Sequence, residues 1–213
     1  AAAESGLAPA EVRSENTLYM TQSITDTRLL DVLQSQGYRE LVSAHLFAHG
    51  VRVAPSVDDK HMLVEHAGEE LGHFEIVAGL YEQVSGKSLY DAVAARAEAM
   101  PVPTSWLEVA VAAYLVDRAA SVQLAAYEAL GDPQLSRVIH KILDHEHEHQ
   151  TAAETSLRDQ CQGPDARRDV VQQLVDRWYP LAYATTEVTP EIAAAFAESV
   201  RPTLQSCGLQ LPR

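Results

Sequence analysis

Two copies of one short motif supply the residues with which this sequence could do chemistry. Glu70 and His73 form one copy of Glu-x-x-His, and Glu146 and His149 form the other. Residues three apart lie on the same face of an α-helix, so each copy can direct a carboxylate and an imidazole at the same point. Two such motifs, with one carboxylate from each of two further helices, are how four-helix bundles hold two metal ions. The sequence must therefore supply two more carboxylates.

The position of the first loop predicts one of them. Residues 50–58 interrupt a helical pattern, and Glu40 and Glu70 lie at equal distances before and after the middle of this break. Both helices rise about 1.5 Å per residue, so residues at equal distances from a turn lie at the same height in an antiparallel pair. Glu40 is therefore the predicted carboxylate of the first helix.

The position of the second loop predicts the other. Asp117 and Glu146 lie at nearly equal distances on either side of the turn at 131–133. Glu128 is the rival on this helix, but it is so close to the turn that it would lie roughly 15 Å from the required height. A spacing that works in two hairpins independently is much stronger evidence for a metal site than one Glu-x-x-His motif, which acidic helices often carry as a solvated pair. Asp117 is therefore preferred.

The surroundings of these residues indicate that they are buried and need a compensating charge. In each predicted helix the proposed ligand falls within the apolar stripe that should face the core. A buried carboxylate without a partner is costly and usually takes up a proton. Two divalent cations would balance four carboxylates beside two neutral histidines. The predicted metal ligands, which are also the predicted catalytic residues, are Glu40, Glu70, His73, Asp117, Glu146 and His149.

Several polar neighbours have both a structural and a functional interpretation. Glu69 could replace Glu70 only if the helix rotated by about 100°, which would spoil the spacing to His73. His147 is expected to face solvent, and Arg118 is expected to form a structural ion pair. Four further residues lie one helical turn from a proposed ligand: His66, Tyr114, Ser121 and His145. The histidines could orient a ligand through a hydrogen bond, and the other two could line a substrate cavity, but ordinary packing explains them equally well.

Composition and length limit the partners of the protein. At 213 residues the chain suits a single domain with a substantial core. The net charge of −14 disfavours a broad nucleic-acid surface. Cys161 and Cys207 fit a reduced cytoplasmic protein, and a disulfide between them stays open. We expect no membrane segment, because no apolar run is expected to reach membrane length and the N-terminus lacks the regions of a secretion signal.

The elements that must position the proposed ligands are all helical. Residues 1–22 are expected to form a flexible tail, residues 27–160 the metal-binding bundle, and residues 165–207 accessory helices. The proline-containing residues 100–104 form a long crossover between the two ligand-bearing hairpins. The expected helices cover residues 27–48, 58–84, 89–99, 106–130, 133–160, a segment ending at 179, and a segment beginning at 189.

Two stretches resemble a known family. Residues 114–120, Tyr-Leu-Val-Asp-Arg-Ala-Ala, and residues 146–150, Glu-His-Glu-His-Gln, are similar to the ferritin-like di-iron oxygenases. The similarity is greatest to the phenylacetic acid catabolic protein family, which includes the catalytic subunit of the phenylacetyl-CoA ring epoxidase, and it covers residues 30–154. It implies an all-α, ferritin-like four-helix bundle with a long crossover and additional C-terminal helices. It also implies that the six ligands hold two iron ions, with O₂ as co-substrate.

The resulting interpretation is an O₂-dependent, non-heme di-iron monooxygenase that hydroxylates or epoxidises a small organic substrate, aromatic or carrier-linked. The chain has no flavin, nicotinamide or iron–sulfur motif, so an external electron donor, such as a separate reductase, is expected. A homodimer and manganese in place of iron stay open. The alternatives are an aldehyde-deformylating or N-oxygenating di-iron oxidase, an iron-storage or peroxide-scavenging protein, and a metal-free assembly protein.

Overall fold

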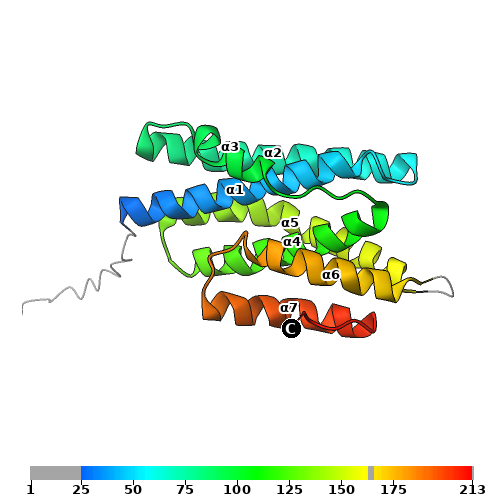
Figure 1. Cartoon of the computed structure of the whole chain (residues 1–213). Helices are drawn as coiled ribbons and strands as arrows, with labels where there is room; N and C mark the ends of the chain where they lie inside the picture. The colour runs from blue at the N-terminus through cyan, green and yellow to red at the C-terminus, as the bar shows by residue number, and fades with distance from the viewer. Residues whose placement is uncertain (1–24, 163–165, 213) are drawn as a thin grey trace, which may run out of the picture.

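The chain folds into a helical bundle (Figure 1). The structure, a computed structural model, describes residues 25–162 and 166–212, without the side chains of residues 144, 145, 147 and 148. The expected tail at 1–22 lies outside the described residues, and the single-domain organisation stays a prediction. The helices of the described chain are α1 (Asp26–Gly50), α2 (Val57–Ser85), α3 (Leu89–Glu98), α4 (Trp106–Glu128), α5 (Pro133–Cys161), α6 (Arg168–Tyr183) and α7 (Pro190–Ser206).

Short polar residues determine where these helices begin. A Ser, Thr or Asp side chain accepts a hydrogen bond from the first turn of every helix except α6. At α2 the cap is reciprocal, because Ser56 and Asp59 each bond the backbone of the other. Such a cap contributes about 1 kcal/mol. The helix ends at Gly86, whose φ of 68° lies in the left-handed region that glycine adopts without strain.

The helices are arranged in two hairpins and a covering pair (Figure 1). α1 packs on α2 and α4 packs on α5, while α3 lies against α1. The close approach of α3 depends on Gly37, because a Cβ atom there would lie only 2.5 Å from a methyl carbon of Leu89. α6 and α7 cover α4. The ferritin-like all-α bundle with a long crossover and additional C-terminal helices is thereby confirmed.

The end of α6 is the helix boundary that differs most from the prediction. The sequence placed it at residue 179, yet the helix continues through Pro180 to Tyr183. Proline removes one backbone hydrogen bond from a helix. Trp178 and Ala182, which lie four residues apart on one face, are both fully buried on either side of it. Tertiary packing therefore outweighs the local preference of proline.

The crossover is fixed to the bundle by one buried carboxylate. The backbone N–H and the hydroxyl of Thr104 both donate to Glu108 Oε2 at 2.8 Å, and the indole N–H of Trp178 donates to Oε1 at 2.9 Å. Arg177 donates to the same Oε1 at 2.7 Å. Burial alone would raise the pKa of Glu108, but these donors hold it below its usual value. The start of α4 is therefore tied both to the crossover and to α6.

α4 is the central helix of the bundle. An 18-residue window of it has a mean hydropathy of 1.3, so it is long and apolar enough to cross a membrane, contrary to the expectation that no segment would be. Within the structure, 72% of that window is buried against the other helices. Burial in the core accounts for its apolar character. At the far end of the same core Cys161 and Cys207 are both free and buried, so the disulfide that the sequence left open is not formed.

Candidate metal centre

All six predicted ligands lie inside the bundle. Glu40 comes from α1, Glu70 and His73 from α2, Asp117 from α4, and the second Glu-x-x-His pair from α5. None of the six is more than 4% exposed. Buried apolar residues flank them along the helices, as Leu63 and Val77 do on α2. The centre is therefore a polar layer between two apolar halves of the core.

Four of the six converge most closely. Glu40, Glu70, His73 and Glu146 each offer one ligand atom, and these atoms all lie within 4.8 Å of one another. His73 Nδ1 is 3.5 Å from an oxygen of Glu40 and 3.5 Å from Glu70 Oε2. Three carboxylates and one imidazole at this separation could bind a metal ion. The hairpin spacing and the helical spacing of the motif together explain why α1, α2 and α5 meet here.

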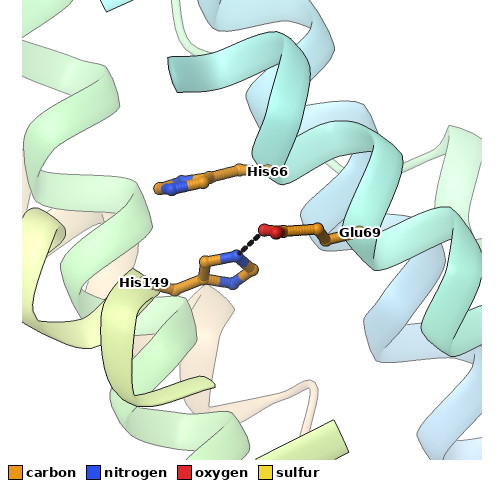
Figure 2. Close-up of side chains that lie close together, drawn as sticks. All are labelled: His66, Glu69 and His149. Atoms are coloured by element: carbon orange, nitrogen blue, oxygen red, sulfur yellow. Dashed lines mark hydrogen bonds and ion pairs between the residues drawn. The ribbon is translucent and has the colours of Figure 1, made fainter. Parts of the chain in front are cut away.

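His149 connects this group to a second one (Figure 2). Its Nδ1 lies 3.1 Å from Glu70 Oε1, and its Nε2 lies 2.6 Å from Glu69 Oε2. Glu70 is therefore placed between the two motif histidines, with one oxygen toward each. The ring of His66 lies over the ring of His149, with centroids 4.2 Å apart and planes 40° apart. His66, Glu69 and His149 form the second group that could hold a metal ion.

The role of Glu69 was missed by the sequence, which considered it only as a rival of Glu70. Its carboxylate instead hydrogen-bonds the outer nitrogen of His149 (Figure 2). Such a partner fixes the orientation and tautomer of a metal-binding histidine. The signal that could have revealed it is position: the residue before Glu70 points about 100° around the helix, toward the neighbouring α5.

A buried polar chain behind Glu40 was also missed. Gln36 donates to Glu40 Oε1, and Arg39 donates to the side-chain oxygen of Gln36. Arg39 is only 1% exposed and also donates to the backbone oxygen of Thr185 at 3.1 Å, in the loop between α6 and α7. Glu40 is thus held from behind by an uncharged amide that is itself held by a buried cation. Gln36 and Arg39, which lie three residues apart on the helix face beside the predicted ligand, are the signal that could have revealed it.

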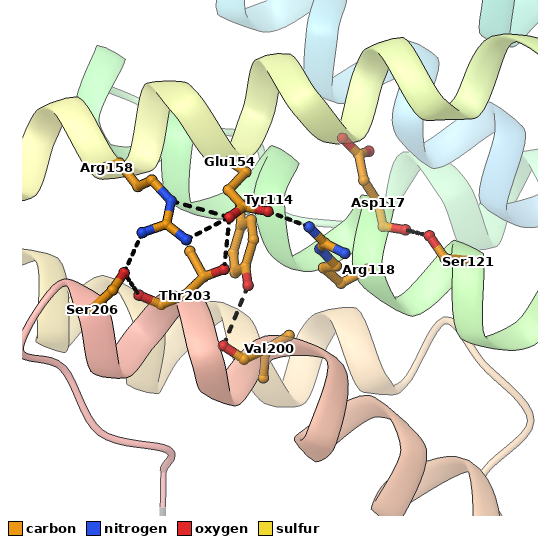
Figure 3. Close-up of polar contacts among 9 residues, drawn as sticks. All are labelled: Tyr114, Asp117, Arg118, Ser121, Glu154, Arg158, Val200, Thr203 and Ser206. Carbon is orange, nitrogen blue, oxygen red and sulfur yellow. Dashed lines mark hydrogen bonds and ion pairs between the residues drawn. The ribbon is translucent and has the colours of Figure 1, made fainter.

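Asp117 is buried but lies outside both groups (Figure 3). Its Oδ2 accepts no hydrogen bond from the described residues. Burial raises the pKa of Asp117 to about 7, and His149 and Arg118 oppose this only in part. A buried carboxylate oxygen without a donor is what a bound cation would satisfy. Its role as a ligand nevertheless stays a prediction.

The neighbours of Asp117 have structural partners (Figure 3). Arg118 forms the expected ion pair, and its partner is Glu154 on α5. The hydroxyl of Tyr114 donates to the backbone oxygen of Val200, and that of Ser121 donates to the backbone oxygen of Asp117. These contacts favour the structural interpretation over a cavity lining. The rival Glu128 contacts His140 at an exposed position, and the side chains of residues 145 and 147 lie outside the described residues.

The electrostatics of the cluster show how strongly it needs positive charge. Burial raises the pKa of Glu40 to about 7 and that of Glu146 well above its usual value. Burial opposes ionisation of Glu70 as well, but its contacts with His149 and His73 lower its pKa to about 2. Burial would lower the pKa of each histidine, yet the carboxylates raise them to about 10 at His73 and about 9 at His149. Protons thus supply the compensation that cations would otherwise give, so the donor set fits two divalent metals.

A helical bundle that encloses two Glu-x-x-His motifs and two further carboxylates defines a class of protein with a candidate dinuclear metal centre. The chain belongs to the phenylacetic acid catabolic protein family, whose model matches residues 14–213. The resemblance seen at residues 114–120 and 146–150 is confirmed by this match. A comparison with curated proteins found no match.

Proposed function

We propose that the protein is an O₂-dependent, non-heme di-iron monooxygenase that hydroxylates or epoxidises a small organic substrate. The observation that carries the proposal is the convergence of buried carboxylates and imidazoles from α1, α2 and α5, beside a buried carboxylate on α4, in a member of this catabolic family. When bound, two iron ions would activate O₂ for transfer of one oxygen atom. Electrons would come from a separate reductase, because the sequence carries no redox-cofactor motif.

The proposed ligands differ in the positions that they take around the centre. Glu70 has one oxygen toward each motif histidine, which supports the proposal that it would contact both ions. Glu69 contacts the outer nitrogen of His149 and would keep a proton there, so that a metal ion that displaced the other ring proton would meet the lone pair of Nδ1. Asp117 supplies a buried oxygen without a hydrogen-bond donor among the described residues.

The surroundings of the centre exclude water. Phe47 packs edge-on against the rings of His66 and His149, at centroid distances of 5.2 and 5.9 Å. Leu63 and Val109 line the same side. An apolar wall of this kind protects a strong oxidant from water and from unwanted reductants, which a site open to solvent would not do.

The proposal is tested by metal analysis and by oxygen consumption. The protein reconstituted anaerobically with ferrous ion should hold about two irons per chain, and chemical reduction should start O₂ uptake. The Glu146→Gln and Asp117→Asn variants should lose iron, whereas the Glu128→Gln variant, altered at an exposed carboxylate, should keep it. A wild-type protein that stays empty would refute the proposal. Preferential retention of manganese would refute the choice of iron, and a large hollow shell by sedimentation would support iron storage.

A further inference from the structure

Two hollows lie in series between α2, α4 and α5, beside the proposed centre. The outer hollow has a volume of about 660 Å³ and is open to solvent. The inner one, of about 20 Å³, reaches the rings of His66 and His149. Met62, Trp106, Ala152 and Ser156 line both, so these four residues form the partition between them. The two hollows therefore mark one route from the surface to the histidine side of the cluster.

The inner hollow is apolar and closed by side chains that can move. Its volume is enough for about one water molecule, so an organic molecule can pass only if the partition shifts. Met62 is an unbranched, flexible side chain, which adapts easily to a guest. Trp106 is the first residue of α4 and is only half-buried. Beyond them the wall carries small residues, among them Ala110 and Ala113, which leave room when the larger side chains swing away.

The charge along this route disfavours anions. Among the described residues that line the two hollows there is no Lys or Arg, and the outer hollow carries the carboxylates of Asp59 and Asp159. At the inner end, His149 is already paired with Glu69 and Glu70. Arg118 and Arg158 line a different hollow, beyond Thr151 and Thr155 on α5. Both of these guanidinium groups bind Glu154 (Figure 3). A phosphate or carboxylate in the outer hollow would therefore meet two negative charges and no free cation.

We propose that this route admits the substrate, and that the substrate is an uncharged, largely apolar organic molecule without a phosphate or carboxylate group. The inference rests on the proposed function, because it assigns the substrate class of the same centre. The proposed substrate class differs from coenzyme thioesters, which an enzyme would hold through their phosphates. Met62 and Trp106 move aside to admit the molecule, and the acidic entrance selects against anions.

The fluorescence of Trp106 provides the test. Nitroaromatic rings quench tryptophan, so 4-nitrobenzyl alcohol, 4-nitrobenzoate and 4-nitrophenyl phosphate offer one ring with charges of zero, minus one and minus two. The neutral probe should quench saturably and bind at least about tenfold more tightly than either anion. The other tryptophan, Trp178, is fully buried and lines neither hollow, so the Trp106→Phe variant should lose the saturable signal.

Two variants locate the site and its charge selectivity. Ala152→Phe narrows the partition and should weaken binding of 4-nitrobenzyl alcohol at least about tenfold. Ala195→Phe makes the same change at an exposed position on α7 and should have no effect. Asp159→Lys reverses an exposed charge at the outer hollow and should strengthen binding of 4-nitrobenzoate severalfold while leaving the neutral probe unchanged.

Three results would overturn the inference: equal binding of the neutral and anionic probes, unchanged binding in Ala152→Phe, or displacement of 4-nitrobenzyl alcohol by phenylacetyl-CoA at a comparable concentration. The readout needs neither metal nor turnover. A protein that binds the neutral probe but no iron would refute the proposed function alone. A protein that loads two irons but shows no preference for the neutral probe would refute the substrate class alone.

Discussion

Binding of two divalent ions should release at least about three protons from the cluster at pH 7. His73 and His149, with pKa values of about 10 and 9, each hold one proton in the metal-free protein. Glu40 and Asp117, at about 7, are each half-protonated and together hold a third. Burial also raises the pKa of Glu146 well above its usual value, which favours a further proton there. Metal ligands must lose these protons, so the protons that leave offset most of the four positive charges that arrive.

Calorimetric titration with Mn²⁺ measures this number directly, because the apparent enthalpy varies with the ionisation enthalpy of the buffer in proportion to the protons released. At pH 8.5 the number should be smaller by about one, since Glu40 and Asp117 have then lost their protons. The Glu128→Gln variant should release the same number as the wild type, because that carboxylate is exposed and outside the cluster. Release of fewer than about two protons at pH 7 would refute the account of charge compensation.

Three further predictions follow from the same contacts. The metal-free protein should become less stable as the pH rises. The raised pKa values of Asp117, Glu40, His73 and His149 contribute stability that is present at low pH and lost as the pH rises through about 7 to 10. The lowered pKa of Glu70, about 2, contributes stability that is fully present above about pH 4.5. Urea unfolding of chelator-treated protein should therefore give a smaller free energy of unfolding at pH 9 than at pH 6, and a larger one would contradict the assigned shifts. Glu69→Gln should weaken Mn²⁺ binding about tenfold, because His149 loses a charged partner; unchanged affinity in calorimetry would show that the contact does not orient the ring. Glu108→Gln should lower the free energy of unfolding by about 2 kcal/mol, because an amide cannot accept the four hydrogen bonds that this carboxylate accepts; metal content should stay unchanged, and its loss would mean that the crossover positions the centre.

The sequence predicted the fold because helical hairpins are local. The spacing of apolar residues predicted which helix faces are buried, and the breaks at 50–58 and 131–133 predicted the pairing of α1 with α2 and of α4 with α5. The N-caps are local as well, as Ser105 is at the start of α4. The end of α6 was the exception, because its position depends on the burial of Trp178 and Ala182 against other helices, which local rules do not include.

The candidate site was predictable only for residues that share a helix face with the core. Glu40 and Glu70 satisfy that condition, and both are buried. Glu69 does not, because it leaves the core-facing stripe and reaches His149 from the adjacent face of α2. Arg39 contacts Thr185, which lies far away in the sequence. Such contacts depend on how helices pack side by side, and the local rules that can be applied to a single sequence do not predict that packing.

Helix packing explains where the proposed substrate route lies. α6 and α7 cover α4, and Arg118 and Arg158 are held by Glu154 on the flank nearest α7. The two hollows of the route lie between α2, α4 and α5, where Trp106 and Met62 stand between them. The family relationship supports the proposed chemistry of the bundle, but the acidic entrance belongs to residues of this chain. Substrate choice is therefore decided at Asp59 and Asp159, at the outer end of a route that ends at His149, and can change without any change in the ligand set.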